Sequence, residues 1–260
     1  MLTVAAAVVA ALVVLVVERR RSRRALARVE ARLEAASRSL EGLQHAFARF
    51  APATVVDDII ALGASTRSEK KEVTVLFADL KGFTALAERL DPEVLVRVLN
   101  GYFERMSTVI RAEQGQLAKF IGDGILALFG AVSANPWQAR DAVRAALGMR
   151  AALVEYNGQL AGEGLSPLAV GIGIHRGPVI AGVIGSTELI EYGVIGSTVN
   201  VAARVEELTR VHGVDILVTE AVSVALDGRF RRRAMPPVAV KGVSGVVETF
   251  AIEGFDEERA

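Results

Sequence analysis

The chain has 260 residues, of which 52% are hydrophobic and 23% are charged, and its 30 Lys and Arg residues equal its 30 Asp and Glu residues in number. This balance excludes the overall positive charge that is typical of nucleic-acid-binding proteins. The absence of cysteine excludes disulfide bonds, thiolate nucleophiles and zinc sites built on thiolates. The length leaves room for one globular domain of about 180 residues behind an N-terminal extension.

The N-terminal segment, residues 1–17, carries no charge and consists mainly of Ala, Val and Leu. Its length is close to the lower limit of about 17–25 residues for a helix that crosses a bilayer, so we expect a single transmembrane helix. A buried core helix is the alternative. Arginines at positions 19, 20, 21, 23 and 24 follow the apolar run. The positive-inside rule then places the N-terminus outside the plasma membrane and the rest of the chain in the cytoplasm.

A helical segment follows, in which apolar residues alternate at spacings of three and four from Leu26 to Phe50. This pattern is typical of a parallel two-stranded coiled coil, which we predict over residues 18–50. A single amphipathic helix that packs on its own domain is the alternative. Pro52 ends this helix, and residues 51–71 read as a short amphipathic segment and a polar linker.

The globular domain is expected over residues 72–252, followed by a tail at 253–260. Apolar runs predict strands at 73–78, at 116–121 and 125–129 as a hairpin, at 168–175, 179–184 and 190–195, and near residues 216, 238 and 247. Helical periodicity predicts helices at 92–111, 136–159 and 198–211, and a short one between 219 and 226. This order favours an α+β sandwich with helices on one side of a mainly antiparallel sheet.

Two aspartates stand at the ends of predicted strands. Asp79 directly follows the first strand, in VLFADLKGFT, and Asp123 lies at the tip of the hairpin, in KFIGDGILALF. If these strands are neighbours, the two carboxylates meet at one edge of the sheet, where they can bind hard divalent cations. Two such ions assist displacement at phosphorus. The alternative for either aspartate is a turn residue whose side chain hydrogen-bonds to the backbone.

Two further features suit a nucleotide. Gly82 follows the first strand, and it permits close backbone approach, so that the amides at the start of the next helix can bind a polyphosphate. Asn200 and Arg204 are four residues apart on one predicted helix and share a face. An amide and a guanidinium side by side can orient a ribose and stabilise charge on a transferring phosphoryl group. A solvent-exposed helix face is the alternative.

Taken together, these segments resemble the catalytic domain of the class III adenylate and guanylate cyclases. The resemblance rests on the order and spacing of VTVLFADLKGFT, KFIGDGILALFG, GIGIHRGPVIAGVIG, YGVIGSTVNVAAR and VKGVSG. It implies the ferredoxin-like α+β fold of the class. It also implies a phosphorus–oxygen lyase that converts ATP to 3′,5′-cyclic AMP and pyrophosphate, by in-line attack of the ribose 3′-hydroxyl with the help of two divalent ions, Mg²⁺ or Mn²⁺.

The resemblance further implies roles for single residues. Asp79 and Asp123 would be metal ligands together with the Leu80 carbonyl, and the amides of Gly82, Phe83 and Thr84 would lie near the phosphates. Lys119 would read the purine, Asn200 would orient the ribose, Arg204 would stabilise the transition state, and Lys241 would contact a phosphate. In this class the metal ligands and the Lys, Asn and Arg residues of one site come from different subunits, so a homodimer with two composite sites is implied.

Base selection departs from the class at one position. The class selects adenine with a lysine and an aspartate or threonine, and guanine with a glutamate and a cysteine or similar small residue. Lys119 fits adenine, but the second position is Gly193, which has no side chain to hydrogen-bond the base. The sequence therefore predicts an adenylate cyclase with relaxed discrimination against GTP. A guanylate or dual-specificity cyclase and an inactive dimerisation module are the alternatives.

Overall fold

The computed structural model describes residues 68–185, 190–239 and 246–257, together with Arg32, Glu34 and Arg38. The predicted transmembrane helix and almost all of the predicted coiled coil and linker lie outside these residues. Arg32, Glu34 and Arg38 are helical and exposed. In the part of the chain that is described, no helix combines the length and the apolar character needed to cross a bilayer.

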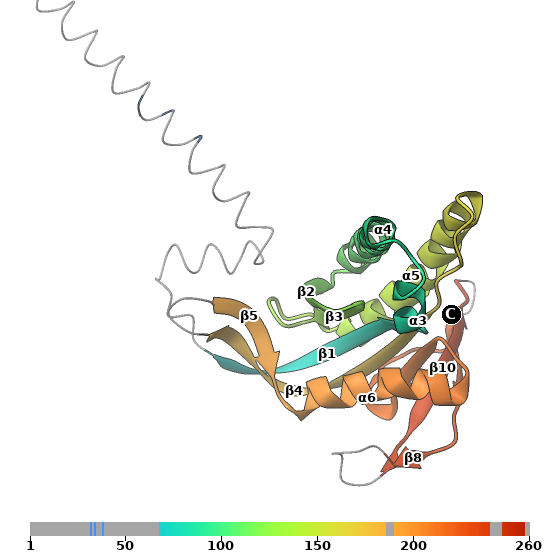
Figure 1. Cartoon of the computed structure of the whole chain (residues 1–260). Coiled ribbons are helices and arrows are strands. Elements are labelled where there is room, and N and C mark those ends of the chain that lie inside the picture. The colour runs from blue at the N-terminus through green and yellow to red at the C-terminus, as the bar shows by residue number, and fades with distance from the viewer. Residues whose placement is uncertain are drawn as a thin grey trace, which may run out of the picture. The chain divides into compact units, whose positions relative to one another are not determined.

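One mixed sheet organises the described domain, in the strand order β2-β3-β1-β4-β6-β10-β7, with β5 paired to β4 (Figure 1). The strands are β1 (Glu69–Leu80), β2 (Gln116–Ile121), β3 (Gly124–Phe129), β4 (Val170–Gly185), β5 (Ile190–Ile195), β6 (Ile216–Thr219), β7 (Phe230–Ala234) and β10 (Thr249–Phe255). Two short strands, β8 (Val238–Ala239) and β9 (Val246–Val247), pair with each other. The β4–β6 pair is parallel and the other described pairs are antiparallel, which confirms the predicted mainly antiparallel sheet.

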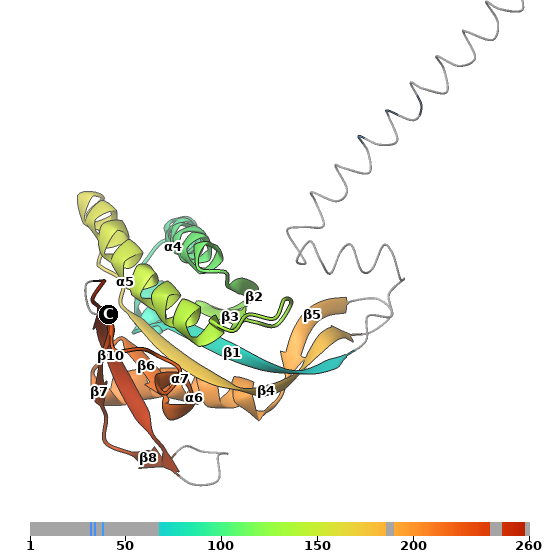
Figure 2. The ribbon, with the colours of Figure 1, turned by 180° about the vertical axis from the view of Figure 1, so that it is seen from behind.

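Helices cover both faces of this sheet (Figures 1 and 2). Two long helices, α4 (Pro92–Ala112) and α5 (Gln138–Gly162), lie on one face, and α6 (Ser197–His212) lies on the other. In β1, Leu76 and Ala78 pack into the core beneath α4 and α5, while Val73 and Val75 pack with Ala202 of α6. The prediction of helices on one side only is wrong, because both faces of the central strands are apolar and both must be covered.

The predicted helix at 92–111 is confirmed as α4, and its start follows from local sequence. The Asp91 side chain accepts a hydrogen bond from the Glu93 backbone amide at 2.9 Å, and Pro92 occupies the first turn, where no backbone donor is needed. Buried side chains then recur every four residues at positions 98, 102, 106 and 110. This stripe packs the helix on the sheet.

Two parts of the sheet differ from the prediction. Strand β4 runs without a break where two strands are expected, because β1 pairs with it from Glu69↔Ala181 to Leu80↔Val170 and keeps Pro178 inside the ladder. The sequence did not predict β7 or β10 as such, nor the short helix α3 (Phe83–Ala87). Strand β7, with the sequence FRRRA, lacks apolar alternation, because its arginines are exposed at the sheet edge.

Glycines of β4 allow α6 to lie unusually close to the sheet. A Cβ atom on Gly173 would lie 2.1 Å from the Glu206 backbone nitrogen, and one on Gly171 would lie 2.3 Å from the Thr209 hydroxyl oxygen. A Cβ atom on Gly177 would lie 2.8 Å from the Thr198 hydroxyl oxygen. The helix therefore runs antiparallel to β4, and its C-terminal end lies beside the end of β1.

Candidate active site

The structure brings Asp79 and Asp123 together. β1 pairs with β3 up to Ala78↔Ile125, so the turn that carries Asp123 lies beside the end of β1. The Leu80 amide donates to Asp123 Oδ2 at 3.2 Å. Burial and then the neighbouring charge of Asp79 raise the pKa of Asp123. The hairpin thus holds two carboxylates in direct electrostatic contact, although they are 44 residues apart in the sequence.

Two glycines of the hairpin turn make this contact possible. Gly122 has φ 62°, in the left-handed region that favours glycine. A Cβ atom on Gly124 would lie 3.3 Å from Asp79 Oδ1 and 3.4 Å from the Ala78 carbonyl oxygen. A larger residue at position 124 would therefore crowd the carboxylate of Asp79.

This pair of carboxylates fits a divalent ion. Two adjacent carboxylates repel one another and provide the oxygen donors that Mg²⁺ and Mn²⁺ prefer. Over residues 68–185, 190–239 and 246–257, no group of three or more His, Cys, Asp or Glu side chains forms a ready metal cluster. A bound ion would therefore complete its coordination with a backbone carbonyl such as that of Leu80, with water or with substrate oxygens.

Helix α6 adds an arginine to this site that sequence reasoning missed. Arg210 Nη2 donates to Asp79 Oδ2 at 2.5 Å, across 131 residues of sequence, and Arg210 Nη1 lies 3.6 Å from Glu206 Oε1. Glu206 is only 5% exposed. Burial raises its pKa to about 7, while Arg210 acts to lower that pKa and Asp79 to raise it further. The only local signal was the spacing of four on a helix, which is common on solvated helix faces.

The loop after Asp79 carries the predicted phosphate-binding amides. Gly82 has φ 72° and precedes α3, which begins at Phe83; the Phe83 side chain packs on the core and Thr84 is exposed. Lys81 Nζ donates to the Val214 carbonyl at 2.6 Å, and burial lowers its pKa. The loop is thus tied to the C-terminal end of α6 rather than open on all sides.

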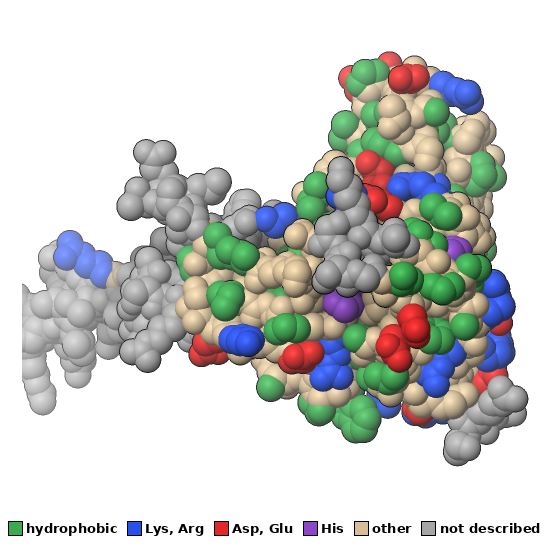
Figure 3. All heavy atoms as spheres, turned by 90° about the horizontal axis from the view of Figure 1, so that it is seen from below, with side chains coloured by type: hydrophobic (Ala, Val, Ile, Leu, Met, Phe, Trp, Pro, Cys, Tyr) green, Lys and Arg blue, Asp and Glu red, His purple; other side chains and the backbone are tan. Residues whose placement is uncertain are grey.

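Asn200 and Arg204 lie on the same helix as Arg210 but farther from the carboxylates. At 1.5 Å per residue, Asn200 is about 15 Å and Arg204 about 9 Å from Arg210 along the axis of α6. Asn200 is exposed, and Arg204 Nη1 donates to Glu207 Oε1 at 2.5 Å. Figure 3 shows the side of the molecule on which α6 lies, where acidic, basic and apolar side chains are interspersed. Within one chain, Asn200 and Arg204 do not meet Asp79 and Asp123.

The predicted base-reading residues lie on different strands. Lys119 is partly buried in β2, next to a bulge in the β2–β3 pairing, and Gly193 is buried in β5, opposite Gly182 of β4. Strands β3 and β1 separate β2 from β4 in the sheet. Lys241 lies outside the described residues.

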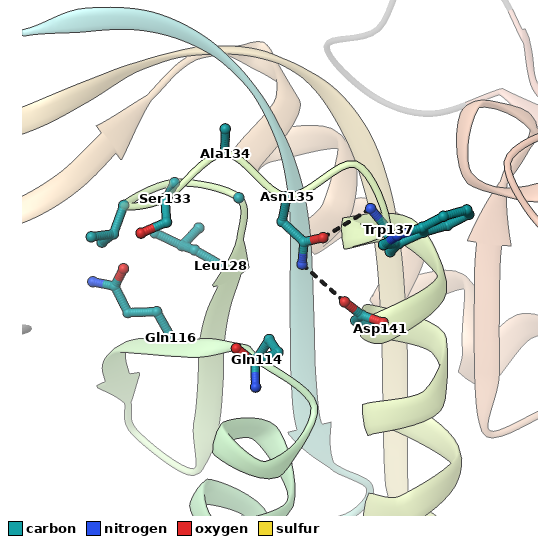
Figure 4. A pocket seen from close by; sticks show the side chains of 11 residues that line it. Gln114, Gln116, Leu128, Ser133, Ala134, Asn135, Trp137 and Asp141 are labelled. Atoms are coloured by element: carbon teal, nitrogen blue, oxygen red, sulfur yellow. Dashed lines mark hydrogen bonds between the residues drawn. The ribbon is translucent and has the colours of Figure 1, made fainter.

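A separate cavity of about 380 Å³ opens near the loop between β3 and α5 (Figure 4). Its lining includes Gln114, Gln116 and Trp137, and it contains none of the predicted site residues. Asn135 orders this loop, because its side chain donates to Asp141 Oδ2 at 2.9 Å and accepts from the Trp137 amide at 2.8 Å. The carboxylate pair is therefore not part of this cavity.

Comparisons with known proteins identify the family. Residues 66–254 match the family described as the adenylate and guanylate cyclase catalytic domain. An adenylate cyclase of Anabaena cylindrica is 33% identical over 236 residues, which cover 86% of this chain and 46% of the relative. The chain thus spans about half the length of that relative.

Solved structures of both nucleotide specificities are similar to the chain. The guanylyl cyclase Cya2 is 38% identical with a TM-score of 0.68, and the similarity covers 74% of this chain and 97% of that chain. The adenylyl cyclase CyaB from P. aeruginosa is 28% identical with a TM-score of 0.70, covering 75% and 100% of the two chains. On the match over residues 66–254 and the fold described above, the chain belongs to the adenylate and guanylate cyclase catalytic domain family.

Proposed function

We propose that the chain is an adenylate cyclase that converts ATP to 3′,5′-cyclic AMP and pyrophosphate. The observation that carries the proposal is the meeting of Asp79 and Asp123 at the end of β1, inside a domain of the cyclase family. The preference for ATP rests on Lys119, because a lysine donates a hydrogen bond and adenine N1 accepts one, whereas guanine N1 is itself a donor. The similarity to an adenylate cyclase of Anabaena cylindrica supports the same choice.

Asp79, Asp123 and the Leu80 carbonyl are the groups that would hold divalent ions. Bound Mg²⁺ or Mn²⁺ supplies a lower pKa for the ribose 3′-hydroxyl and neutralises charge on the departing pyrophosphate. Asn200 orients the ribose, and Arg204 donates to the charge that develops on the α-phosphoryl group. To do so, Arg204 breaks its ion pair with Glu207 and contacts the α-phosphoryl group instead. This change costs little free energy, because the side chains of Arg204 and Glu207 are both exposed to solvent.

The active form is a homodimer in the proposed mechanism. Asn200 stands about 15 Å along α6 from Arg210, which contacts Asp79. This separation is too large for Asn200 to orient the ribose of the same ATP whose phosphates lie at Asp79 within a single subunit. Asn200 and Arg204 of one subunit would therefore complete the carboxylate site of the other. Residues 18–50, with their heptad pattern, would hold the two chains together.

A guanylate or dual-specificity cyclase is the second candidate. Two observations favour it: Gly193 offers no side chain to the base, and the guanylyl cyclase Cya2 is 38% identical to this chain. The two candidates differ only in the product that the purified enzyme forms from each nucleotide.

The full chain, purified in detergent and assayed with ATP and GTP in Mg²⁺ and in Mn²⁺, tests both candidates. Chromatography is expected to show cyclic AMP as the main product. Asp79→Asn and Asp123→Asn are each expected to lower the rate by about a hundredfold or more. Asp227→Asn is the control, since it removes a carboxylate that pairs with Arg229 in an exposed turn. Equal rates of cyclic GMP formation would favour the second candidate, and full activity in Asp79→Asn would refute the two-carboxylate mechanism.

Residues 1–17 are proposed to anchor the catalytic domain at the plasma membrane, with the N-terminus outside. The support is the uncharged apolar run and the arginines that follow it. Deletion of residues 2–17 is expected to move the chain from the sedimenting membrane fraction to the supernatant. An unchanged distribution between these fractions would show that this segment is not the anchor.

A further inference from the structure

Arg210 links two carboxylates that differ in their access to solvent. Its Nη2 atom donates to Asp79 Oδ2 at 2.5 Å, and its Nη1 atom lies 3.6 Å from Glu206 Oε1. The side chains of Arg210 and Asp79 are 41% and 32% exposed, while that of Glu206 is 7% exposed. Ions from solvent can therefore reach Asp79, whereas Glu206 is shielded from solvent.

Glu206 has an unused acceptor. Its Oε1 atom is buried and has no hydrogen-bond partner. A buried carboxylate oxygen without a donor is costly, so a donor that approaches it is favoured. The 3.6 Å separation from Arg210 Nη1 is longer than a hydrogen bond by less than about 1 Å, and a small movement of the guanidinium would close it.

We propose that Arg210 is a displaceable counter-ion of the metal site: it neutralises Asp79 before a divalent ion binds and turns to Glu206 when the ion takes Asp79. This inference rests on the proposed metal role of Asp79 and Asp123. The guanidinium and the ion compete for Asp79 Oδ2, and their positive charges repel one another. The guanidinium also has donors for two carboxylates in one rigid plane, which makes the exchange possible without moving α6.

Arg210 is therefore a positioning residue that sets the affinity for divalent ions. While it holds Asp79, the carboxylate pair keeps its geometry without metal, because the arginine offsets the repulsion from Asp123. An ion must then displace a bound cation, so that the observed affinity is lower than the two carboxylates alone would provide. Glu206 offsets part of this loss by accepting the displaced guanidinium.

Binding of Mn²⁺ alone to the full chain, with free Mn²⁺ measured by electron paramagnetic resonance, tests this exchange without any turnover. Arg210→Met is expected to lower the Mn²⁺ dissociation constant roughly tenfold, because the competing charge is gone. Glu206→Gln is expected to raise it several-fold, since the displaced arginine keeps a neutral acceptor but loses the negative charge that attracts it. The double variant is expected to lie close to Arg210→Met, because most of the effect of Glu206 passes through Arg210.

Two control variants distinguish the proposed exchange from a general effect of removing a positive charge and from a loss of folding. Arg97→Met removes an arginine of α4 that pairs, at the same 2.5 Å distance, with Glu163, the residue after α5, and it should leave the dissociation constant unchanged. Arg210→Lys retains the competing charge, so it should stay close to the unmodified chain in metal affinity. Thermal unfolding would reveal whether Arg210→Met folds. If it does not fold, Arg210→Lys still tests the inference, because a tenfold gain in Mn²⁺ affinity in Arg210→Lys would overturn the counter-ion role.

The remaining outcomes separate this inference from the proposed function. An unchanged dissociation constant in Arg210→Met overturns the counter-ion role, and so does an equal effect of Glu206→Gln with and without Arg210. If Asp79→Asn abolishes Mn²⁺ binding while Arg210→Met has no effect, only the counter-ion inference fails. If Asp79→Asn leaves Mn²⁺ binding unchanged, the proposed metal site itself is wrong.

Discussion

Gly193 of β5 is buried, and its environment leaves room for a small side chain. A Cβ atom at this position would lie 3.4 Å from its nearest neighbour, the end of the flexible Ile184 side chain, which is close to ordinary van der Waals contact. We expect Gly193→Thr to raise the ratio of cyclic AMP to cyclic GMP formation by about three- to tenfold, because the threonine hydroxyl adds one hydrogen bond to the base. The ratio is measured with both nucleotides in one reaction.

Gly193→Val is the matched control for this prediction. Valine has nearly the shape of threonine without the hydroxyl group, so it should change the overall rate in a similar way and leave the nucleotide ratio close to that of the unmodified chain. A valine variant that gains the same selectivity as threonine would show that shape, rather than hydrogen bonding, is responsible.

His175 of β4 makes the stability of the domain depend on pH. Burial lowers the pKa of His175 to about 4, and its Nδ1 atom lies 2.8 Å from the Thr219 hydroxyl oxygen. Between pH 6.5 and 4 the unfolded chain binds a proton at this histidine and the folded chain does not, so the free energy of unfolding falls as the pH falls. The loss is on the order of 2 kcal/mol, allowing for partial solvent access.

Urea unfolding of the unmodified chain and of His175→Asn at about pH 7.5 and about pH 4.5, on either side of the ordinary histidine pKa, isolates this contribution from that of the carboxylates. The variant lacks a group that titrates in this range, so it should lose less stability between the two pH values. An equal loss in both chains would assign the pH dependence to other groups.

At the scale of elements, the contact between α6 and β4 depends on glycine. Gly173→Ala would place a methyl group 2.1 Å from the Glu206 backbone nitrogen, so the helix must move. We expect the free energy of unfolding to fall by about 1–3 kcal/mol or more, with a loss of activity, because α6 carries Asn200, Arg204 and Arg210. Chemical unfolding and the cyclase assay measure the two effects.

Gly158→Ala is the matched control for Gly173→Ala, because it makes the same substitution at a position where the added methyl group has room. Gly158 lies in α5, and, apart from the neighbouring backbone of this helix, no atom of the described residues lies within 4 Å of the place that a Cβ atom would take there. Alanine should therefore stabilise the helix by about 0.5–1 kcal/mol. If Gly173→Ala were as stable as this control, the close approach of α6 would not be required for folding.

At the scale of the whole molecule, the proposed composite site predicts complementation between two inactive chains. Asp79→Asn removes a carboxylate from one half of each site, and Asn200→Ala removes the proposed ribose-orienting group from the other half. A heterodimer of the two variants keeps one intact site, so it should regain about half of the activity of the unmodified dimer. Each variant alone should remain inactive, and differently tagged chains allow the heterodimer to be purified.

Failure of the purified heterodimer to regain activity would contradict the composite site. It is the result expected if each site were built from the residues of one chain, because each of the two chains would then lack one required residue. Mixing Asp79→Asn with Asp123→Asn is the matched control. Both changes affect the same half of the site, so that heterodimer is expected to stay inactive.

Much of the fold and the positions of the candidate site residues were readable from the sequence because their signals are local. An apolar run that ends in Asp79, a Gly-Asp-Gly turn between two apolar runs and a pair of polar residues four apart on a helix each depend on a few neighbouring residues. Their order matched one family, and β1, the β2–β3 hairpin and the long helices appear where these patterns predict them. The roles of the individual site residues remain predictions.

Tertiary structure alone decided which distant groups meet. Arg210 contacts Asp79 across 131 residues, because the glycines of β4 bring α6 close to the end of β1. Periodicity indicates whether a residue is buried, but it does not indicate which element that residue packs against. It therefore could not place α6 on the opposite face of the sheet from α4 and α5. It also missed β7, whose exposed arginines hide the alternation of a strand, and the unbroken β4, which pairs with β1 along twelve consecutive residue pairs.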